Sequence, residues 1–298
     1  MGHGSTGEKE RSGRFEDKRA ILAVERNRWI LAYLRHAPVS LCIRELNRLI
    51  AAEMLDRELL PRSPVLDVGC GDAFWWTQRD ARGRQVYGID ISASEIAQAA
   101  ERIEAKVADI SAVRPFAPTR FRDIVGNCSL EHVRDIDSAL RNLREVAASD
   151  ARFVLFVPTP QWAYQGNIQR WLLSRAPRLA MTLAGAMNGF FQHWHLYDLR
   201  VWQRLLERNG WRVVRAHGLG SPRSEFLFRL FLPLSFPEFL AKTLIGVYPS
   251  RLLRFIPDVV LSPLRRLVSW ALSDPIVSPD APNAYEYVIV AECASDAD

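Results

Sequence analysis

Apolar residues recur at helical spacing in the first sixty positions of the chain. Ile21, Leu22, Trp29, Ile30, Tyr33 and Leu34 fall on one helical face, and Pro38 then interrupts the run. A second apolar series extends from Leu41 to Leu55. We therefore predict an N-terminal helical cap over residues 15–60, preceded by a flexible segment over residues 1–14 that is rich in Gly and charged residues.

Short β-prone runs alternate with amphipathic segments between residues 61 and 220, and a last β-prone run covers residues 284–294. Such alternation is typical of a parallel sheet with helices on its faces. The predicted strands are Val65–Val68, Gln85–Asp90, Lys106–Ala108, Asp123–Asn127, Arg152–Val157, Trp211–Ala216 and Tyr285–Cys293. The predicted helices are Ala73–Ala81, Ser94–Ile103, Ile136–Ala147 and Leu199–Asn209.

Two connections are longer than a compact domain needs, Gln161–Gln192 and Leu219–Asn283. Loops of this length are usually lids or binding elements, or they hold structure of their own. The second connection contains a helical insertion, residues 221–283, whose prolines are expected to divide it into helices too short to cross a membrane. Between Ser221 and Trp270 it carries seven basic and three acidic residues among many apolar ones. It is therefore either a substrate lid or a contact with an anionic membrane surface.

Composition restricts the function classes. The 298 residues are 48% apolar and 24% charged, as in globular proteins, with a net charge of +5. The arginines are scattered rather than clustered, so no nucleic-acid partner is expected. The four cysteines have no metal-binding spacing, and we expect no metal. No apolar signal segment opens the chain, which predicts a cytoplasmic protein, with peripheral membrane contact as the alternative. The oligomeric state stays open.

A glycine turn follows the first predicted strand, in the segment Val65-Leu66-Asp67-Val68-Gly69-Cys70-Gly71. Glycines let backbone N–H groups approach a ligand, and the N-terminus of the following helix favours negative charge. The dinucleotide fingerprint needs a further glycine at position 74, where this chain has Phe74. An NAD- or nucleotide-binding Rossmann enzyme is thus the weaker alternative.

Acidic residues stand at the ends of the next two predicted strands. Asp90 ends the second strand, where a carboxylate can accept both hydroxyls of an adenosine ribose. Its alternative role is to cap the helix that follows. Asp109 comes after the third strand, and its alternative is that of a plain loop residue.

These segments together resemble class I S-adenosylmethionine-dependent methyltransferases. The glycine turn resembles their motif I, with Ala73 in place of the third glycine, and Val107-Ala108-Asp109-Ile110 resembles motif III. The run from Asp123 to Val133, with Leu130-Glu131-His132-Val133, resembles the type 11 methyltransferase family. The resemblance implies a Rossmann-like α/β fold with a mostly parallel sheet and an antiparallel last strand, and S-adenosylmethionine as cofactor. The implied cofactor residues are Asp67, Gly69, Cys70 and Gly71 for the methionine part, Asp90 for the ribose, Ile91, Asp109 and Ile110 for the adenine, and also Asn127 and Cys128.

Methyl transfer is an in-line displacement that can require a general base. His195 is the favoured candidate, followed by His132 and Tyr197. The apolar insertion predicts a bulky, apolar or lipid-linked small-molecule acceptor. A non-catalytic subunit that binds S-adenosylmethionine remains a further alternative.

Overall fold

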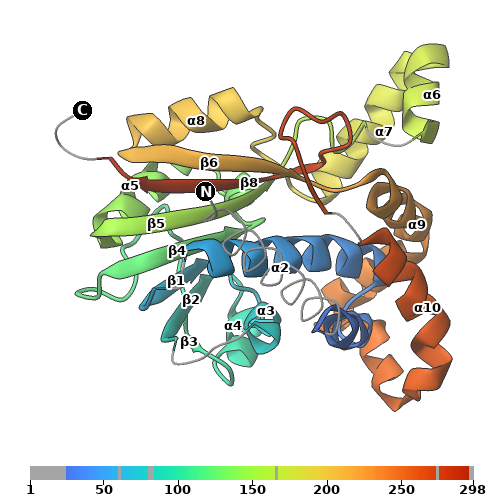
Figure 1. The fold of residues 1–298 in the computed structure, drawn as a ribbon, viewed down its shortest axis with the longest axis horizontal. Coiled ribbons are helices and arrows are strands. Elements are labelled where there is room, and N and C mark those ends of the chain that lie inside the picture. Colours follow the sequence, from blue (N-terminus) through green and yellow to red (C-terminus); the bar gives the residue numbers. More distant parts are fainter. Residues whose placement is uncertain (1–24, 60–61, 80–83, 165–166, 273–274, 295–298) are drawn as a thin grey trace, which may run out of the picture. The chain divides into compact units, whose positions relative to one another are not determined.

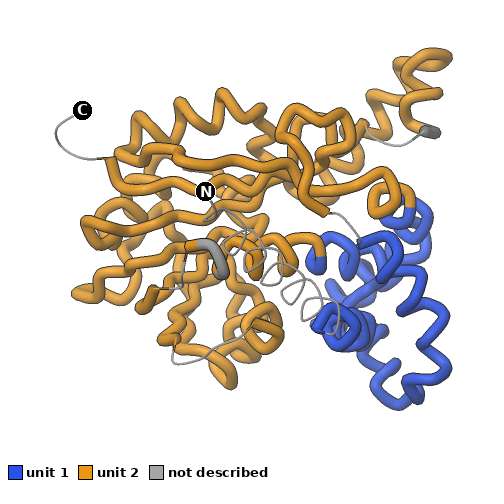
Figure 2. Tube along the Cα trace, in the orientation of Figure 1, with its two compact units in different colours: residues 1–46, 227–273 blue, residues 47–226, 274–298 orange. Residues whose placement is uncertain are grey.

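The computed structural model describes residues 25–59, 62–79, 84–164, 167–272 and 275–294. The chain forms two compact units (Figure 2). One consists of Met1–Leu46 and Leu227–Ser273, the other of Asn47–Phe226 and Asp274–Asp298. The first boundary falls inside a continuous helix, α2 (Val39–Leu59), rather than at the predicted residue 60. The segment 1–14, predicted to be flexible, lies outside the described residues.

The larger unit is built on an eight-stranded sheet in the order β3-β2-β1-β4-β5-β8-β6-β7 (Figure 1). Strands β3, β2, β1, β4 and β5 are parallel, and β8 runs antiparallel between β5 and β6. The predicted mostly parallel α/β fold with an antiparallel last strand is therefore confirmed. The short β7 was not expected from the sequence. The strand bounds are β1 Val65–Val68, β2 Val86–Asp90, β3 Glu104–Val107, β4 Phe121–Asn127, β5 Ala147–Pro158, β6 Trp211–Leu219, β7 Ile276–Val277 and β8 Glu286–Cys293.

Side-chain alternation along β5 divides the core between the two faces of the sheet. Phe153, Leu155 and Val157 are fully buried in a cluster with residues of α5 and α8. Phe156 points to the other face, where its ring lies edge-on to Trp75. The helices of this unit are α3 Phe74–Gln78, α4 Ala93–Ala99, the 3-10 helix η1 Leu130–His132, α5 Ile136–Val146, α6 Asn167–Arg175, α7 Pro177–Phe190 and α8 Leu199–Arg208.

Local signals explain where the core helices begin and end. Asp135 caps α5 by accepting from the Ser138 amide, and Asp198 caps α8 by accepting from the Val201 amide. Gly210 stands just after α8 and has a φ of 82°. This left-handed conformation is typical of a glycine that ends a helix. The long connection at 161–192 holds α6 and α7, a helical pair that extends beyond the sheet (Figure 1).

The order of the strands determines where a ligand can bind. Strand β1 lies between β2 and β4, so the strands that follow it in the sequence are placed on both sides of it. In parallel α/β sheets, ligands bind at such a switch point, beyond the carboxyl ends of the strands. The glycine turn after β1, Asp90 at the end of β2 and Cys128 after β4 all stand at this edge.

The smaller unit is helical, with a helix over residues 25–34, then α9 Pro222–Ile245, the 3-10 helix η2 Pro249–Phe255 and α10 Asp258–Ala271. The prediction that prolines cut this insertion into short helices is wrong for α9, which continues for 24 residues through Pro233 and Pro237. Both prolines are exposed, and water can satisfy the carbonyl groups that they leave without a partner. Among the described residues no single helix is long and apolar enough to span a membrane. Helices α9 and η2 reach that level only as a pair, with a bend of 100° between them.

Candidate active site

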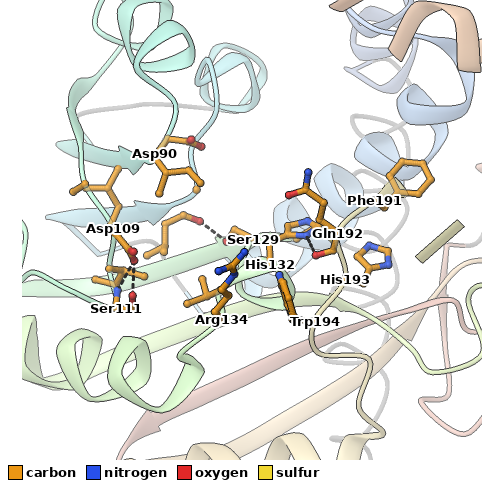
Figure 3. A pocket seen from close by; sticks show the side chains of 18 of the residues that line it. Asp90, Asp109, Ser111, Ser129, His132, Arg134, Phe191, Gln192, His193 and Trp194 are labelled. Atoms are coloured by element: carbon orange, nitrogen blue, oxygen red, sulfur yellow. Dashed lines mark hydrogen bonds between the residues drawn. The ribbon is translucent and has the colours of Figure 1, made fainter. Parts of the chain in front are cut away.

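A cavity of about 1240 Å³ opens at the switch point of the sheet. Its lining comes from the carboxyl ends of β1, β2 and β4, the loop after β3, and residues 188–194, which include the end of α7 and the segment after it (Figure 3). Pockets for one drug-sized ligand usually measure about 300–1,000 Å³. This cavity therefore has room for a cofactor together with a second molecule.

The turn after β1 needs glycine for steric reasons. Gly69 has a φ of 72°, and a Cβ built on it would lie 2.4 Å from the Cβ of Ser129. Gly71 and Ala73 also have positive φ angles, 54° and 58°. Ala73 thus adopts the left-handed conformation that glycine prefers, which explains how it can replace the third glycine of the motif. The turn brings backbone, rather than side chains, to the cavity wall at Gly69.

Two carboxylates enter the cavity beside this turn. Asp90 accepts a hydrogen bond from the Gly71 amide at 3.0 Å and another from the Ser92 amide at 2.8 Å. Asp109 accepts from the amide and the hydroxyl of Ser111. Both carboxylates lie on one side of the cavity in Figure 3 and retain lone pairs for a ligand. The helix after β2 is capped by Ser92 and not by Asp90, so the alternative role of Asp90 does not apply.

The hydrophobic residues predicted to hold an adenine also line the cavity. Ile91 is 76% exposed there, whereas Ile110 is almost fully buried. An apolar side chain as exposed as Ile91 leaves a hydrated surface that a flat aromatic ring can cover. Cys128, in the left-handed conformation after β4, lines the cavity as well.

Four other predicted cofactor residues lie behind the lining. Asp67 is 2% exposed and accepts from the indole Nε1 of Trp76 at 2.7 Å, which ties β1 to α3. Cys70 is buried, and burial together with Asp67 and Asp90 raises the pKa of its thiol far above the ordinary value. Gly71 reaches the site only through its hydrogen bond to Asp90. Asn127 ends β4 beside Cys128. These residues shape the turn, and direct contact with a cofactor stays a prediction for them.

The preference for His195 as general base requires correction. His195 is 8% exposed, and both ring nitrogens are engaged, Nδ1 with the Tyr197 hydroxyl at 2.9 Å and Nε2 with the Val133 carbonyl at 2.7 Å. Neither His195 nor Tyr197 belongs to the cavity lining. A histidine with both nitrogens bonded to protein holds a loop in place and has no lone pair for a substrate.

His132 lies in the cavity wall with a different arrangement. Its Nδ1 lies 3.1 Å from the carbonyl oxygen of Gln192. A carbonyl only accepts, so Nδ1 carries the proton in the neutral ring and Nε2 keeps the lone pair. Nε2 lies 3.7 Å from Oε1 of the buried Glu131.

His193 stacks on His132, with ring centroids 5.3 Å apart. The indole Nε1 of Trp162 lies 3.0 Å from His193 Nδ1 and 3.0 Å from Asn188 Oδ1. Because an indole N–H only donates, Nδ1 of His193 accepts, and its lone pair is already used. His193 therefore suits a positioning role better than that of a base.

Sequence reasoning treated residues 161–192 only as a long connection and did not identify residues 188–192 as part of one wall of the site. Its position depends on backbone hydrogen bonds from the Trp194 and His195 amides to the Glu131 carbonyl, which no sequence pattern reveals. The one available signal was the length of the connection at 161–192. Ser129, which closes the space over Gly69, was also missed.

The sequence predicted no metal site, but one group of side chains in the structure could hold a metal ion. Ligand atoms of Glu131, His132 and His193 lie within 4.8 Å of one another, a set that could hold a divalent ion. Trp162 donates to Nδ1 of His193, so the proton of the neutral ring is on Nε2. A metal ligand needs a lone pair on the nitrogen that binds the ion, and this hydrogen bond therefore competes with metal binding. We therefore describe the three residues as a metal-free cluster, in which His132 stacks on His193 and lies beside Glu131.

The residues present fit S-adenosylmethionine. The turn at Gly69 leaves no space for a side chain, Asp90 and Asp109 offer carboxylate acceptors for ribose and adenine donors, and Ile91 offers an apolar surface. A cofactor without phosphate groups also suits a turn where Phe74, rather than glycine, begins the next helix.

Comparison with known proteins agrees with this fit. The sequence profile of a family described as "Methyltransferase domain" matches residues 33–216. No curated protein matches the chain.

Many solved structures resemble the fold at low identity. A putative sarcosine dimethylglycine methyltransferase from Galdieria sulphuraria is 12% identical, with a TM-score of 0.49, over 83% of this chain and 85% of that one. The YcgJ protein of Bacillus subtilis is 13% identical, with a TM-score of 0.46, over 82% and 97% of the two chains. Phosphoethanolamine N-methyltransferase 2 of Haemonchus contortus, in complex with S-adenosyl-L-methionine, is 16% identical, with a TM-score of 0.47, over 82% and 52%.

The family profile covers well over half of the chain, including all of the cavity lining. It matches where the glycine turn, the paired carboxylates and the switch-point cavity lie. The chain belongs to the methyltransferase-domain family and is an S-adenosylmethionine-dependent methyltransferase.

Proposed function

We propose that the enzyme methylates a bulky, apolar or lipid-linked small molecule, with His132 as general base. The observation that carries this proposal is a set of aromatic residues in the cavity lining, Phe190, Phe191 and Trp194. Figure 3 shows Phe191 and Trp194 on the side away from Asp90 and Asp109. Trp194 is 56% exposed, and the guanidinium of Arg134 lies 5.1 Å from the centre of its ring. Large apolar surfaces that open on a pocket favour an acceptor that covers them.

The helices that lead to this wall support an apolar acceptor. The sequence has no Asp or Glu from Ala151 to Tyr197, a stretch that includes α6 and α7. On these two helices Trp171, Leu179 and Met181 are each at least 50% exposed. An apolar chain could therefore extend from the cavity along α7 without meeting a carboxylate.

The residues supply orientation and proton removal. Bound S-adenosylmethionine provides an activated methyl group for in-line displacement. In that displacement the bond from the methyl carbon to sulfur would break and the demethylated thioether would leave. His132 Nε2 would receive the proton of the acceptor hydroxyl or amine. The Gln192 carbonyl keeps the ring in the required tautomer.

Transfer of radiolabelled methyl groups tests the acceptor class. Purified enzyme with methyl-labelled S-adenosylmethionine is incubated with the organic-phase and aqueous-phase fractions of a cell extract. We expect the label in organic-soluble products. Label found only in small polar products would contradict the proposed acceptor while leaving the methyltransferase assignment intact.

Replacement of His132 tests the base. His132→Ala is expected to lower kcat on the labelled acceptor on the order of 100-fold or more while the Kd for S-adenosylmethionine stays unchanged. His217→Ala, on β6 and outside the cavity lining, is the matched control and should keep full turnover. A His195→Ala variant that folds normally and loses as much kcat would return the role to His195.

Metal removal distinguishes the metal-free cluster of Glu131, His132 and His193 from a metal site. Enzyme treated with EDTA and then dialysed is expected to keep its turnover, and added Zn²⁺ or Mn²⁺ should not increase it. Activity that disappears with EDTA and returns with one ion, but not in His193→Ala, would assign the ion to Glu131, His132 and His193.

A further inference from the structure

We propose that the helical unit docks on an anionic lipid bilayer through α9, η2 and α10, as a contact that enters one leaflet and does not span the membrane. The proposal goes beyond the proposed function, because docking can be measured whether or not the acceptor is a lipid.

Exposed apolar side chains on all three helices carry the first step. Leu234, Leu244 and Ile245 on α9, Leu252 and Phe255 on η2, and Val259 on α10 are each 63% to 76% exposed. Singly scattered apolar side chains are normal on soluble proteins, whereas many large ones exposed along one segment are typical of interaction sites.

The shape of this segment limits how it can enter a membrane. Helices α9 and η2 reach the hydropathy of a membrane span only together, and they are bent by 100° relative to each other. A segment with so large a bend cannot cross the hydrocarbon core as one straight helix of about 20 residues. It can lie along the interface with its apolar side chains in the acyl region, as amphipathic membrane-surface helices do.

Charge indicates which bilayer the surface fits. Residues 227–272 contain six basic residues and two acidic ones, a net charge of +4. Both acids already have partners within this unit. Glu238 accepts from the amide and hydroxyl of Ser250, and Asp258 pairs with Arg35.

Anionic lipid headgroups would be suitable partners for the basic side chains of this segment. Arg254 and Arg266 are exposed, and the guanidinium of Arg254 lies 4.7 Å from the centre of the Phe255 ring. An arginine beside an exposed aromatic ring places a cation at headgroup depth while the ring enters the acyl region. A protein partner would need acidic groups arranged to match this surface, whereas a bilayer with anionic lipid supplies them everywhere.

Co-sedimentation of the full chain with vesicles tests the proposal. Vesicles of phosphatidylcholine alone are compared with vesicles that also contain 30% phosphatidylglycerol, on the order of the anionic content at which surface attraction is measurable. We expect binding to the anionic vesicles that weakens as salt is raised.

Two double variants and their matched controls locate the contact. Arg254→Glu with Arg266→Glu should lower the partition coefficient at low salt by about tenfold or more, and Leu244→Ser with Ile245→Ser should lower it at every salt concentration. Arg200→Glu with Arg204→Glu on α8, and Val113→Ser with Val214→Ser, make the same chemical changes at exposed positions of the other unit. These controls should bind vesicles as the wild type does.

Calorimetry with S-adenosylmethionine accompanies each variant, and all are expected to keep the wild-type Kd, which confirms that the larger unit is intact independently of turnover. Wild-type protein that does not sediment with anionic vesicles overturns the proposal. Variants of both units that lose binding equally also overturn it, because the contact would then not lie on α9, η2 and α10.

Discussion

Asp90 connects the glycine turn to the start of α4, because its two carboxylate oxygens accept from the Gly71 and Ser92 amides. Asp90→Ala removes these bonds and the acceptor for the ribose hydroxyls. We expect S-adenosylmethionine binding to weaken by about 2–3 kcal/mol, since hydrogen bonds to charged groups are the stronger ones. Calorimetry measures the change, and Glu101→Ala, an exposed acid outside the cavity, is the control. An unchanged affinity in a folded Asp90→Ala variant would remove Asp90 from the cofactor site.

Gly69 and Gly185 form a matched pair for the effect of an added methyl group. At Gly69 the new Cβ would collide with Ser129, and the φ of 72° disfavours any side chain. Gly69→Ala should therefore lower the free energy of unfolding by at least about 1–2 kcal/mol and weaken cofactor binding. At Gly185, inside α7, nothing lies within 4 Å of the added atom. Gly185→Ala should raise stability by about 0.5–1 kcal/mol. Urea denaturation compares the two, and equal effects would contradict the steric argument.

Helices α5 and α8 are joined by Asp137, which accepts from Arg208 through both carboxylate oxygens and from Asn209. The hydrogen bonds from Asn209 and Arg208 lower the pKa of Asp137. A lowered folded-state pKa means that the stabilisation is present above the unfolded-state pKa and disappears as the pH falls through the folded-state value.

Asp137→Asn should therefore lower the free energy of unfolding at pH 7 by up to about 1 kcal/mol, a value limited by solvent screening. The difference from wild type should shrink below about pH 4. Urea denaturation at several pH values measures it, with Glu207→Gln on the exposed face of α8 as control. A difference that stays constant down to pH 2 would show that the carboxylate charge is not its source.

Elements with a continuous local signal could be predicted well. The strand Val65–Val68 was predicted with its observed bounds. A proline precedes these four residues and a glycine turn follows them, so the sequence marks both ends of the strand. The full length of helix α9 could not be predicted from the sequence, because the effect of Pro233 and Pro237 depends on whether water reaches the carbonyls that they leave unbonded. The hydrogen-bond partners of His195 and His132 could not be predicted for a similar reason. Only the folded chain places the Val133 and Gln192 carbonyls against one ring or the other.

Hydrogen exchange over the whole chain should separate cofactor binding from the proposed contact with lipid. The cavity is lined only by residues between Val68 and Trp194, all in the larger unit. We expect S-adenosylmethionine to slow amide exchange around residues 68–73, 89–92 and 108–111, since ligand binding suppresses local opening. Anionic vesicles should instead slow exchange within residues 227–272. Protection of the same peptides by both additions would contradict the assignment of two separate surfaces.

The reactivity of the cysteine thiols is expected to report whether the cofactor pocket is occupied. Cys42 and Cys70 are buried and Cys293 is partly so, and burial raises the pKa of all three thiols. A raised pKa leaves little thiolate for alkylation. Cys128 is partly exposed and stands in the cavity wall itself. A maleimide should therefore label Cys128 first and only while the pocket is empty, so that the extent of labelling reports cofactor occupancy even in an unpurified lysate.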